Sequence, residues 1–329
     1  MPDQLLFAME VMLNGLMAGV MYALVALGFV LIFKASGIFN YAQGVMALFA
    51  AMTLVGIQQG QVPFAHLINA VFGTDIHYFG WEAPALLAIA LTVVVMIAFA
   101  WAVNRFVFGH LVNQEPIILF MATIGLAFFL EGVADLMWGS EIKTLDVGLP
   151  QGINEFIDAT TFEAFGYGFF IDNLDIVATV IAALLVLALV AFSQYTKQGR
   201  ALRAVADDHQ AALSVGISLN FIWVLVWSIA GFVALVAGIM WGAKSGVQFS
   251  LSLIALKALP VLMLGGFTSI PGAIVGGLII GVGEKLFEFL IGAPYLGGAT
   301  ENWFAYVLAL LVLVFRPQGL FGERIIERV

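Results

Sequence analysis

Six apolar stretches, each long enough to cross a lipid bilayer, dominate this sequence. A membrane-spanning helix needs about 20 consecutive, mostly apolar residues. Runs of that length lie at 11–33, 83–104, 117–138, 174–195, 220–243 and 270–291. Three more apolar segments are short or interrupted, at 38–57, 253–268 and 303–315. The sequence therefore predicts an all-α polytopic membrane protein with eight or nine transmembrane segments, some of them broken or short.

The composition supports the same class. Of 329 residues, 63% are hydrophobic and 10% are charged, whereas about 25% of the residues in a soluble domain are charged. A bilayer accommodates so much apolar surface, because lipid-facing side chains need no water while helices satisfy the backbone internally. No long-period repeat and no Pro- or Ser-rich linker divides the chain. We therefore expect a single transmembrane domain over residues 1–329.

Lysine and arginine predict the orientation, because short cytoplasmic loops are enriched in them. Lys197, Arg200 and Arg203 follow the run at 174–195. The segment 139–173 instead carries six acidic residues and a single lysine, Lys143. The expected topology is therefore a cytoplasmic loop at about 196–219, periplasmic loops at about 58–82 and 139–173, an outer N-terminus and a cytoplasmic C-terminus.

The cytoplasmic loop has the spacing of a short amphipathic helix. Leu202, Val205, Ala212 and Leu213 recur every three or four residues, and Gly216 is placed to end the helix as a C-terminal cap. This pattern fits a solvated connector as well as a helix that a soluble partner grips. Composition alone leaves both open.

Resemblance to a known family separates these alternatives. The run Gln210-Ala211-Ala212-x-x-x-Gly216 resembles the Glu-Ala-Ala-x-x-x-Gly loop by which ATP-binding-cassette (ABC) importer permeases dock onto their ATPases, with Gln210 in the place of the usual Glu. Further blocks, in the same order, resemble the LivH-type permeases of branched-chain (hydrophobic) amino acid uptake. They are 14–28, 40–44, 199–204, 264–277 and 316–322.

The resemblance implies a permease subunit that switches access from outside to inside when separate ATPases close. It also implies the partners: a second, homologous (LivM-like) permease, two cytoplasmic ABC ATPases and a periplasmic solute-binding protein, in a bacterial inner membrane. The residues expected to couple to the ATPase are Arg200, Leu202, Arg203, Gln210, Ala211, Ala212 and Gly216.

The solute stays open at this stage. Close relatives commonly have Asn-Phe-Ala-His-Gly-Glu where this chain has Asn40-Tyr41-Ala42-Gln43-Gly44-Val45. The resemblance therefore implies a small organic solute, which is a branched-chain or other amino acid, urea or an amide, or an organic acid.

No catalytic or cofactor motif accompanies these features. The sequence has no Gly-x-x-x-x-Gly-Lys-Ser/Thr loop, so we expect ATP to bind only on partner subunits and this chain to be no enzyme. Its four histidines lack the spacing of metal ligands, which favours structural or solvated roles.

Broken segments at membrane depth are tolerated where they are buried in protein or line a cavity. The polar break at 36–46 is therefore the first candidate for the translocation path, and the segment 264–271 is the second. The candidate path residues are Ser36, Asn40, Tyr41, Gln43, Gly265 and Gly266.

Three ionisable residues lie deep within apolar runs: Glu131, Lys257 and Glu284. Charges at this depth are costly and rarely face lipid. They predict ion pairs that join helices, or else groups that line the path. An ion-coupled secondary transporter that uses these three residues is the alternative function.

Overall fold

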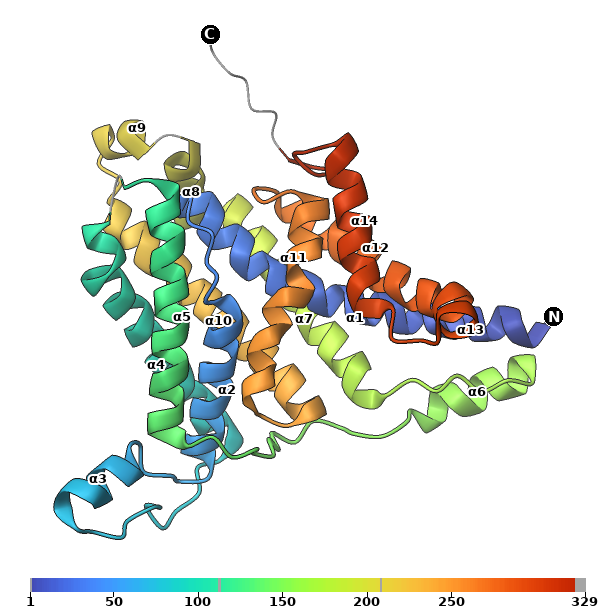
Figure 1. Cartoon of the computed structure of the whole chain (residues 1–329), viewed down its shortest axis with the longest axis horizontal. Helices are drawn as coiled ribbons and strands as arrows, with labels where there is room; N and C mark the ends of the chain where they lie inside the picture. Colours follow the sequence, from blue (N-terminus) through green and yellow to red (C-terminus); the bar gives the residue numbers. More distant parts are fainter. Residues whose placement is uncertain (1, 112–113, 208, 323–329) are drawn as a thin grey trace. The chain divides into compact units, whose positions relative to one another are not determined.

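The computed structural model describes residues 2–111, 114–207 and 209–322 and is built from helices (Figure 1). Those described residues contain three isolated β-bridges but no strand. The all-α class is therefore confirmed. The chain forms two compact units: Met1–Val30, Leu149–Val190 and Leu256–Val329 form unit 1, and Leu31–Gly148 and Ala191–Ala255 form unit 2. The expected single domain stays a prediction, and each unit is described by itself.

Unit 1 holds the greater part of each of the helices α1, α7 and α11, together with five complete elements. They are α1 (Pro2–Ser36), α6 (Glu155–Phe165), α7 (Asn173–Tyr195), α11 (Ile254–Gly265), α12 (Ile270–Phe287), the π-helical η3 (Glu288–Gly292), α13 (Ala293–Leu296) and α14 (Glu301–Phe315).

Unit 2 holds the remaining elements. They are α2 (Gln43–Gln58), α3 (Ala65–Phe72), α4 (Ala85–Phe106), the 3-10 turn η1 (Phe108–His110), α5 (Pro116–Trp138), α8 (Lys197–Asp207), α9 (His209–Ser214), α10 (Leu219–Ser245) and the 3-10 turn η2 (Phe249–Leu253).

Five described helices, α1, α4, α5, α7 and α10, are long and apolar enough to cross a membrane. A sixth candidate is a bent pair, Phe249–Gly265 and Ile270–Leu296, whose axes turn by 114°. The apolar helices α2 and α14 are shorter. The expected count of eight or nine segments is compatible with these elements but stays a prediction, as does a full crossing by 253–268.

The helices of unit 2 pack through small residues. A β-carbon built on Gly238 of α10 would lie 2.5 Å from the carbonyl oxygen of Ala47 in α2, so these two helices meet backbone to backbone. The indole of Trp138 fills the space in front of Gly56 in the same way. Within this unit, α3 lies at one end of the bundle of α2, α4, α5 and α10, and α8 and α9 lie at the other (Figure 1).

In unit 1, glycines join α1 to α12. A β-carbon on Gly15 would lie 2.8 Å from the oxygen of Gly281, and one on Gly19 would lie 2.6 Å from the oxygen of Gly277. Glycine is needed here because any side chain would push the two backbones apart. The glycine spacing in 270–291 predicts such close packing, and the structure confirms it.

Two segments that the sequence predicts as periplasmic loops contain helices. α3 lies within 58–82, and α6 lies within 139–173. α6 begins where the Asn154 side chain accepts a hydrogen bond from the backbone N–H of Ile157 at 2.9 Å, and Glu155 adds a negative charge to its first turn. Both helices are too short and too polar in their surroundings to give a spanning signal.

Candidate functional site

A short non-helical segment separates α1 from α2, and the side chain of Asn40 hydrogen-bonds to residues at the start of α2. Its side chain is completely buried. Its Oδ1 accepts a hydrogen bond from the N–H of Ala42 at 3.1 Å, and its Nδ2 donates to Gln43 Oε1 at 3.2 Å. Polar groups at this depth need partners. Asn40 therefore provides a hydrogen-bond acceptor for the backbone N–H of Ala42, which has no partner within helix α2.

The neighbouring polar side chains differ in exposure. Gln43 is buried and donates from Nε2 to the carbonyl of Ala230 in α10 at 3.2 Å. Ser36 is also buried and donates to Ile32 O at 2.7 Å. Tyr41, by contrast, is 40% exposed, while its backbone N–H donates to Thr123 Oγ1 of α5 at 3.1 Å. Of these four path candidates, Tyr41 therefore has the accessible side chain.

The other two path candidates lie in unit 1, in the turn that ends α11. Gly266 has a φ of +102°, which favours glycine. The turn pairs with the C-terminal segment, because Leu320 N–H donates to Leu264 O at 2.8 Å and Phe321 N–H donates to Gly265 O at 3.1 Å. Two blocks that carry the family resemblance thus meet here, and Gly265 and Gly266 form a tight backbone junction.

Two of the three deep charges, the partly exposed Lys257 and the buried Glu284, form a cluster in unit 1. Glu284 of α12 is completely buried and accepts a hydrogen bond from the Tyr22 hydroxyl of α1 at 2.6 Å. Lys257 Nζ lies 3.8 Å from Glu284 Oε2 and 5.7 Å from the centre of the Tyr22 ring. The cluster therefore links α1, α11 and α12, as the ion-pair interpretation of these charges predicts.

Glu131, the third deep charge, lies in α5 of unit 2. Its side chain is partly exposed. Among the described residues it has no ion pair within 4.0 Å. The structure therefore does not bring Glu131 into a cluster like that of Lys257 and Glu284.

In the coupling loop, α8 and α9 bury most of the apolar face. Leu202, Val205 and Ala212 are each at most 2% exposed, whereas Leu213 is 52% exposed. Three of these side chains are thus buried within the chain itself, and their role in coupling to an ATPase stays a prediction. An amphipathic pattern shows which face is apolar, and here the chain itself covers that face.

The arginines of the loop contact the end of α7. Arg203 donates from its guanidinium to the carbonyl of Ser193, and Arg200 donates to that of Tyr195 at 3.4 Å. Cations at the last carbonyls of a helix also complement its dipole. Arg200 and Arg203 therefore fix where α8 leaves α7.

The rest of the docking motif is exposed. Ala211, Leu213, Val215 and Gly216 lie at the surface, and Gly216 has a φ of +84° after the end of α9. The side chain of Gln210 lies outside the described residues. The exposed surface next to α9 is therefore made by 211 and 213–216, which we call the α9 edge.

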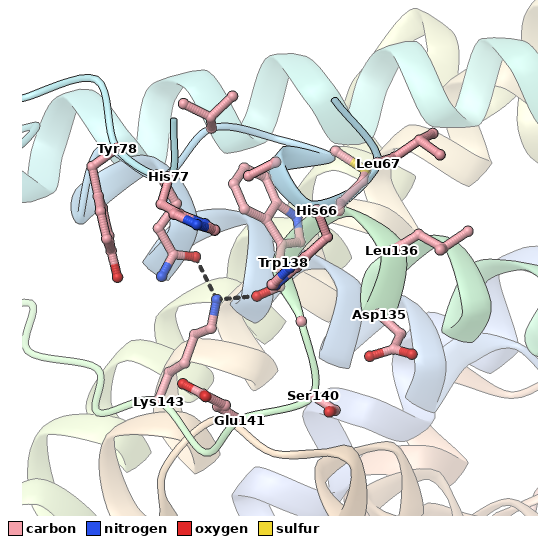
Figure 2. A pocket seen from close by; sticks show the side chains of 15 residues that line it. His66, Leu67, His77, Tyr78, Asp135, Leu136, Trp138, Ser140, Glu141 and Lys143 are labelled. Atoms are coloured by element: carbon pink, nitrogen blue, oxygen red, sulfur yellow. Dashed lines mark hydrogen bonds between the residues drawn. The ribbon is translucent and has the colours of Figure 1, made fainter. Parts of the chain in front are cut away.

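A cavity of about 490 Å³ opens in unit 2 where α5 ends beside α3 (Figure 2). Groups of both charge signs line it, together with apolar side chains such as Leu67 and Leu136. The titratable groups that line it are His66, His77, Tyr78, Asp135, Glu141 and Lys143. Such a lining can contact both ends of a small zwitterion.

Two hydrogen bonds hold the ammonium group of Lys143 in place at the wall of this cavity. Lys143 is 7% exposed, and its Nζ donates to Gln61 Oε1 at 2.5 Å and to Trp138 O at 2.7 Å (Figure 2). Burial lowers the pKa of the Lys143 ammonium from 10.5 to about 8, and the negative charge of Glu141 opposes that shift. An ammonium has three N–H donors, so one remains beyond these two bonds.

Sequence reasoning missed two of these residues. Tyr22 lies in an apolar run and has no charge to mark it, although its hydroxyl needs a partner at that depth. Lys143 carries a usable signal, because it is the single basic residue in an otherwise acidic segment.

The helical fold, the long apolar spans and the charge cluster around the buried Glu284 define a polytopic helical membrane protein. Residues 11–316 match the family model described as "Branched-chain amino acid transport system / permease component". The chain belongs to that family. It is a transmembrane permease subunit of an ABC importer, so these findings do not support the ion-coupled alternative.

Several curated relatives are similar along all or most of their length. The chain is 30% identical to the high-affinity branched-chain amino acid transport system permease protein LivH of Escherichia coli K12, covering 100% of both chains. It is 30% identical to the permease protein BraD of Pseudomonas aeruginosa, covering 98% of each. It is also 28% identical to the ribose import permease protein RbsC of E. coli K12, covering 86% of this chain and 85% of the other.

Proposed function

We propose that this permease carries branched-chain amino acids, or close analogues of them, into the cell. The observation that carries the proposal is full-length similarity to two branched-chain amino acid permeases, LivH and BraD. The ribose permease RbsC aligns over a smaller share of the chain. The relatives therefore favour amino acids over the other solutes that the sequence leaves open.

The cavity beside α3 supports an amino acid rather than urea or a neutral amide. A free amino acid carries a carboxylate and an ammonium, and this cavity offers Lys143 to the first and Asp135 and Glu141 to the second. Leu67 and Leu136 supply apolar surface for an aliphatic side chain. A neutral solute would offer no opposite charge to Lys143, Asp135 or Glu141, so it would bind more weakly.

The transport cycle would involve the other candidate residues. ATP would bind and be hydrolysed on two separate cytoplasmic subunits, which would push on the α9 edge. The break at 36–46, with Tyr41 as its accessible side chain, and the turn at Gly265 and Gly266 would line the path or hinge its walls.

The remaining partners follow from the same assembly. A second, LivM-like permease would complete the membrane domain, and a solute-binding protein would deliver the amino acid. The chain would lie in a bacterial inner membrane with its N-terminus outside and its C-terminus in the cytoplasm. Within unit 2, α3 lies at one end and α8 and α9 lie at the other, which supports placing the loops at 58–82 and 196–219 on opposite sides of the membrane (Figure 1).

Uptake in proteoliposomes tests the function. The full chain, co-reconstituted with its partner permease, ATPases and binding protein, should accumulate labelled leucine only with ATP and the binding protein present. Labelled urea and ribose serve as controls. Leucine uptake that needs no ATPase, or uptake of ribose or urea in place of leucine, would contradict the proposal.

Single cysteines test the topology, because the chain has no cysteine of its own. Glu155→Cys and Ser214→Cys place the thiol at exposed positions. An impermeant thiol reagent should label position 155, but not 214, in intact cells. The reverse pattern would invert the topology.

A further inference from the structure

A second cavity, of about 430 Å³, lies in unit 2 between the C-terminal end of α4 and the first turn of α10. Six of its lining residues matter for its chemistry: Trp101, Asn104, Arg105, His110, Asn220 and Phe221. Because α4 ends and α10 begins there, and both are candidate spans, this cavity lies at the level where membrane meets water.

The charge of this cavity is positive. Arg105 is exposed at its wall, and His110 lies beside it. No carboxylate of the described residues lines it. The first turn of α10 adds to this, because the N–H groups of Leu219 and Asn220 precede the intrahelical hydrogen bonds and carry the positive end of the helix dipole. Anions bind well at such a helix end.

Two further features point to a lipid rather than a soluble anion. Trp101 is 54% exposed and Phe221 is 58% exposed, so aromatic rings flank the cavity at interfacial depth. Asn104 is 5% exposed, and its Oδ1 has no hydrogen-bond partner in the described structure. A buried acceptor of this kind needs a donor.

We infer that this cavity binds the headgroup of a membrane phospholipid. The phosphate lies against Arg105 and the first turn of α10, and a hydroxyl or ammonium on the headgroup supplies the donor that Asn104 lacks. The acyl chains run along α4 beside Trp101. Phosphatidylglycerol, which has both the phosphate and hydroxyl donors, is the probe of choice.

Native mass spectrometry of the full, delipidated chain measures this binding. Dioleoyl phosphatidylglycerol should bind, whereas a diacylglycerol with the same acyl chains should not, because it lacks the phosphate. Arg105→Gln should weaken phosphatidylglycerol binding about tenfold, since it removes a charge-assisted hydrogen bond. Arg316→Gln is the matched control. Arg316 directly follows the apolar helix α14, much as Arg105 lies in the last turn of α4, but it lies outside this cavity.

A second variant, Asn220→Asp, distinguishes weaker lipid binding from a loss of folding. Asn220→Asp adds a negative charge that favours the first turn of α10 itself but repels a phosphate. It should keep the wild-type thermal midpoint and still bind phosphatidylglycerol about tenfold more weakly.

Three results would overturn the inference. The first is equal binding of phosphatidylglycerol by wild type, Arg105→Gln and Asn220→Asp. The second is binding of inorganic phosphate alone with the same dependence on Arg105, which would assign the site to a soluble anion. The third is displacement of the lipid by purified ATPase subunits together with weaker ATPase binding to Arg105→Gln, which would assign the cavity to protein docking.

Discussion

The Tyr22 hydroxyl donates a hydrogen bond to the completely buried Glu284 carboxylate across 2.6 Å, and so connects helices α1 and α12. Lys257 approaches the same carboxylate less closely, at 3.8 Å. Of these two contacts, the tyrosine is therefore the direct hydrogen-bond donor. The cluster explains how a carboxylate can be tolerated inside an apolar helix.

Tyr22→Phe should destabilise unit 1, because it leaves a buried carboxylate oxygen without its donor. The cost should be about 1–2 kcal/mol, given the usual range for hydrogen bonds to charged groups and the smaller values found between membrane helices. Thermal unfolding in detergent measures it. Tyr295→Phe, at a position 81% exposed, is the control and should change nothing. Equal midpoints for both variants would show that the bond contributes nothing to stability.

The glycine contact between α1 and α12 makes a second prediction. A β-carbon on Gly277 would lie 2.5 Å from the carbonyl oxygen of Gly19, and backbone cannot move aside cheaply. Gly277→Ala should therefore lower the thermal midpoint. Gly132→Ala in α5 is the matched control, because nothing lies within 4 Å of its added β-carbon. That control should be neutral or up to about 1 kcal/mol stabilising, since alanine favours helix.

Patterns local in sequence predicted much of this fold. Apolar run length predicted α4, α5, α7 and α10, and the short apolar segment 38–57 corresponds to α2, which begins at Gln43 after the polar break. The glycine spacing of α12 predicted a closely packed neighbour. Each of these signals depends on residues within a few turns of one another.

Contacts between distant residues could not be predicted in this way. Tyr22 and Glu284 are 262 positions apart, and nothing in an apolar run marks which tyrosine will meet which carboxylate. Burial of Ala212 was missed for a related reason. Helical periodicity gives the apolar face of α9, but the same face serves equally well for packing inside the chain and for docking a partner.

Lys143 gives the protein a pH dependence of known sign. Its pKa is lowered to about 8 from 10.5, so between those values the unfolded chain binds more protons than the folded protein. Stability therefore rises with pH across that window, and the full penalty for burying the charge is present below it. Comparing thermal midpoints of wild type and Lys143→Met isolates this contribution.

The wild-type midpoint should rise relative to that of Lys143→Met as the pH increases from 8 to 10.5. Lys197→Met, at an exposed lysine in α8, should track the wild type throughout. A constant difference between wild type and Lys143→Met over this range would mean that Lys143 keeps its ordinary pKa.

If the break at 36–46 lines the translocation path, variants of its exposed and buried residues should affect transport and stability differently. Tyr41→Ala removes a partly exposed ring that meets the Phe120 ring edge-on at 6.4 Å. It should reduce leucine uptake and lower the thermal midpoint less than Asn40→Leu does. Asn40→Leu should lower the midpoint, because Ala42 N–H and Gln43 Oε1 both lose their partner. Uptake by reconstituted complexes and melting of the same preparations measure both. Wild-type uptake by Tyr41→Ala would mean that the break at 36–46 bends the chain but does not line the translocation path.

Variants in α9 and the turn after it can distinguish residues that bind the ATPase from residues that pack inside this chain. Leu213 and Val215 are 52% and 74% exposed, whereas Ala212 between Ala211 and Leu213 is 2% exposed. Leu213→Asp and Val215→Asp should keep the fold but weaken ATPase binding, because a carboxylate would be buried unpaired in the contact.

Ala212→Asp should instead destabilise the loop itself, since its carboxylate would be buried inside this chain without a partner. Co-purification with the ATPase, ATP hydrolysis by the complex and thermal melting resolve the two effects. If Leu213→Asp and Val215→Asp retain ATPase binding and ATP-driven uptake, the α9 edge is not part of the coupling surface. A stable Ala212→Asp that loses only ATPase binding would mean that the buried face opens to the partner during docking.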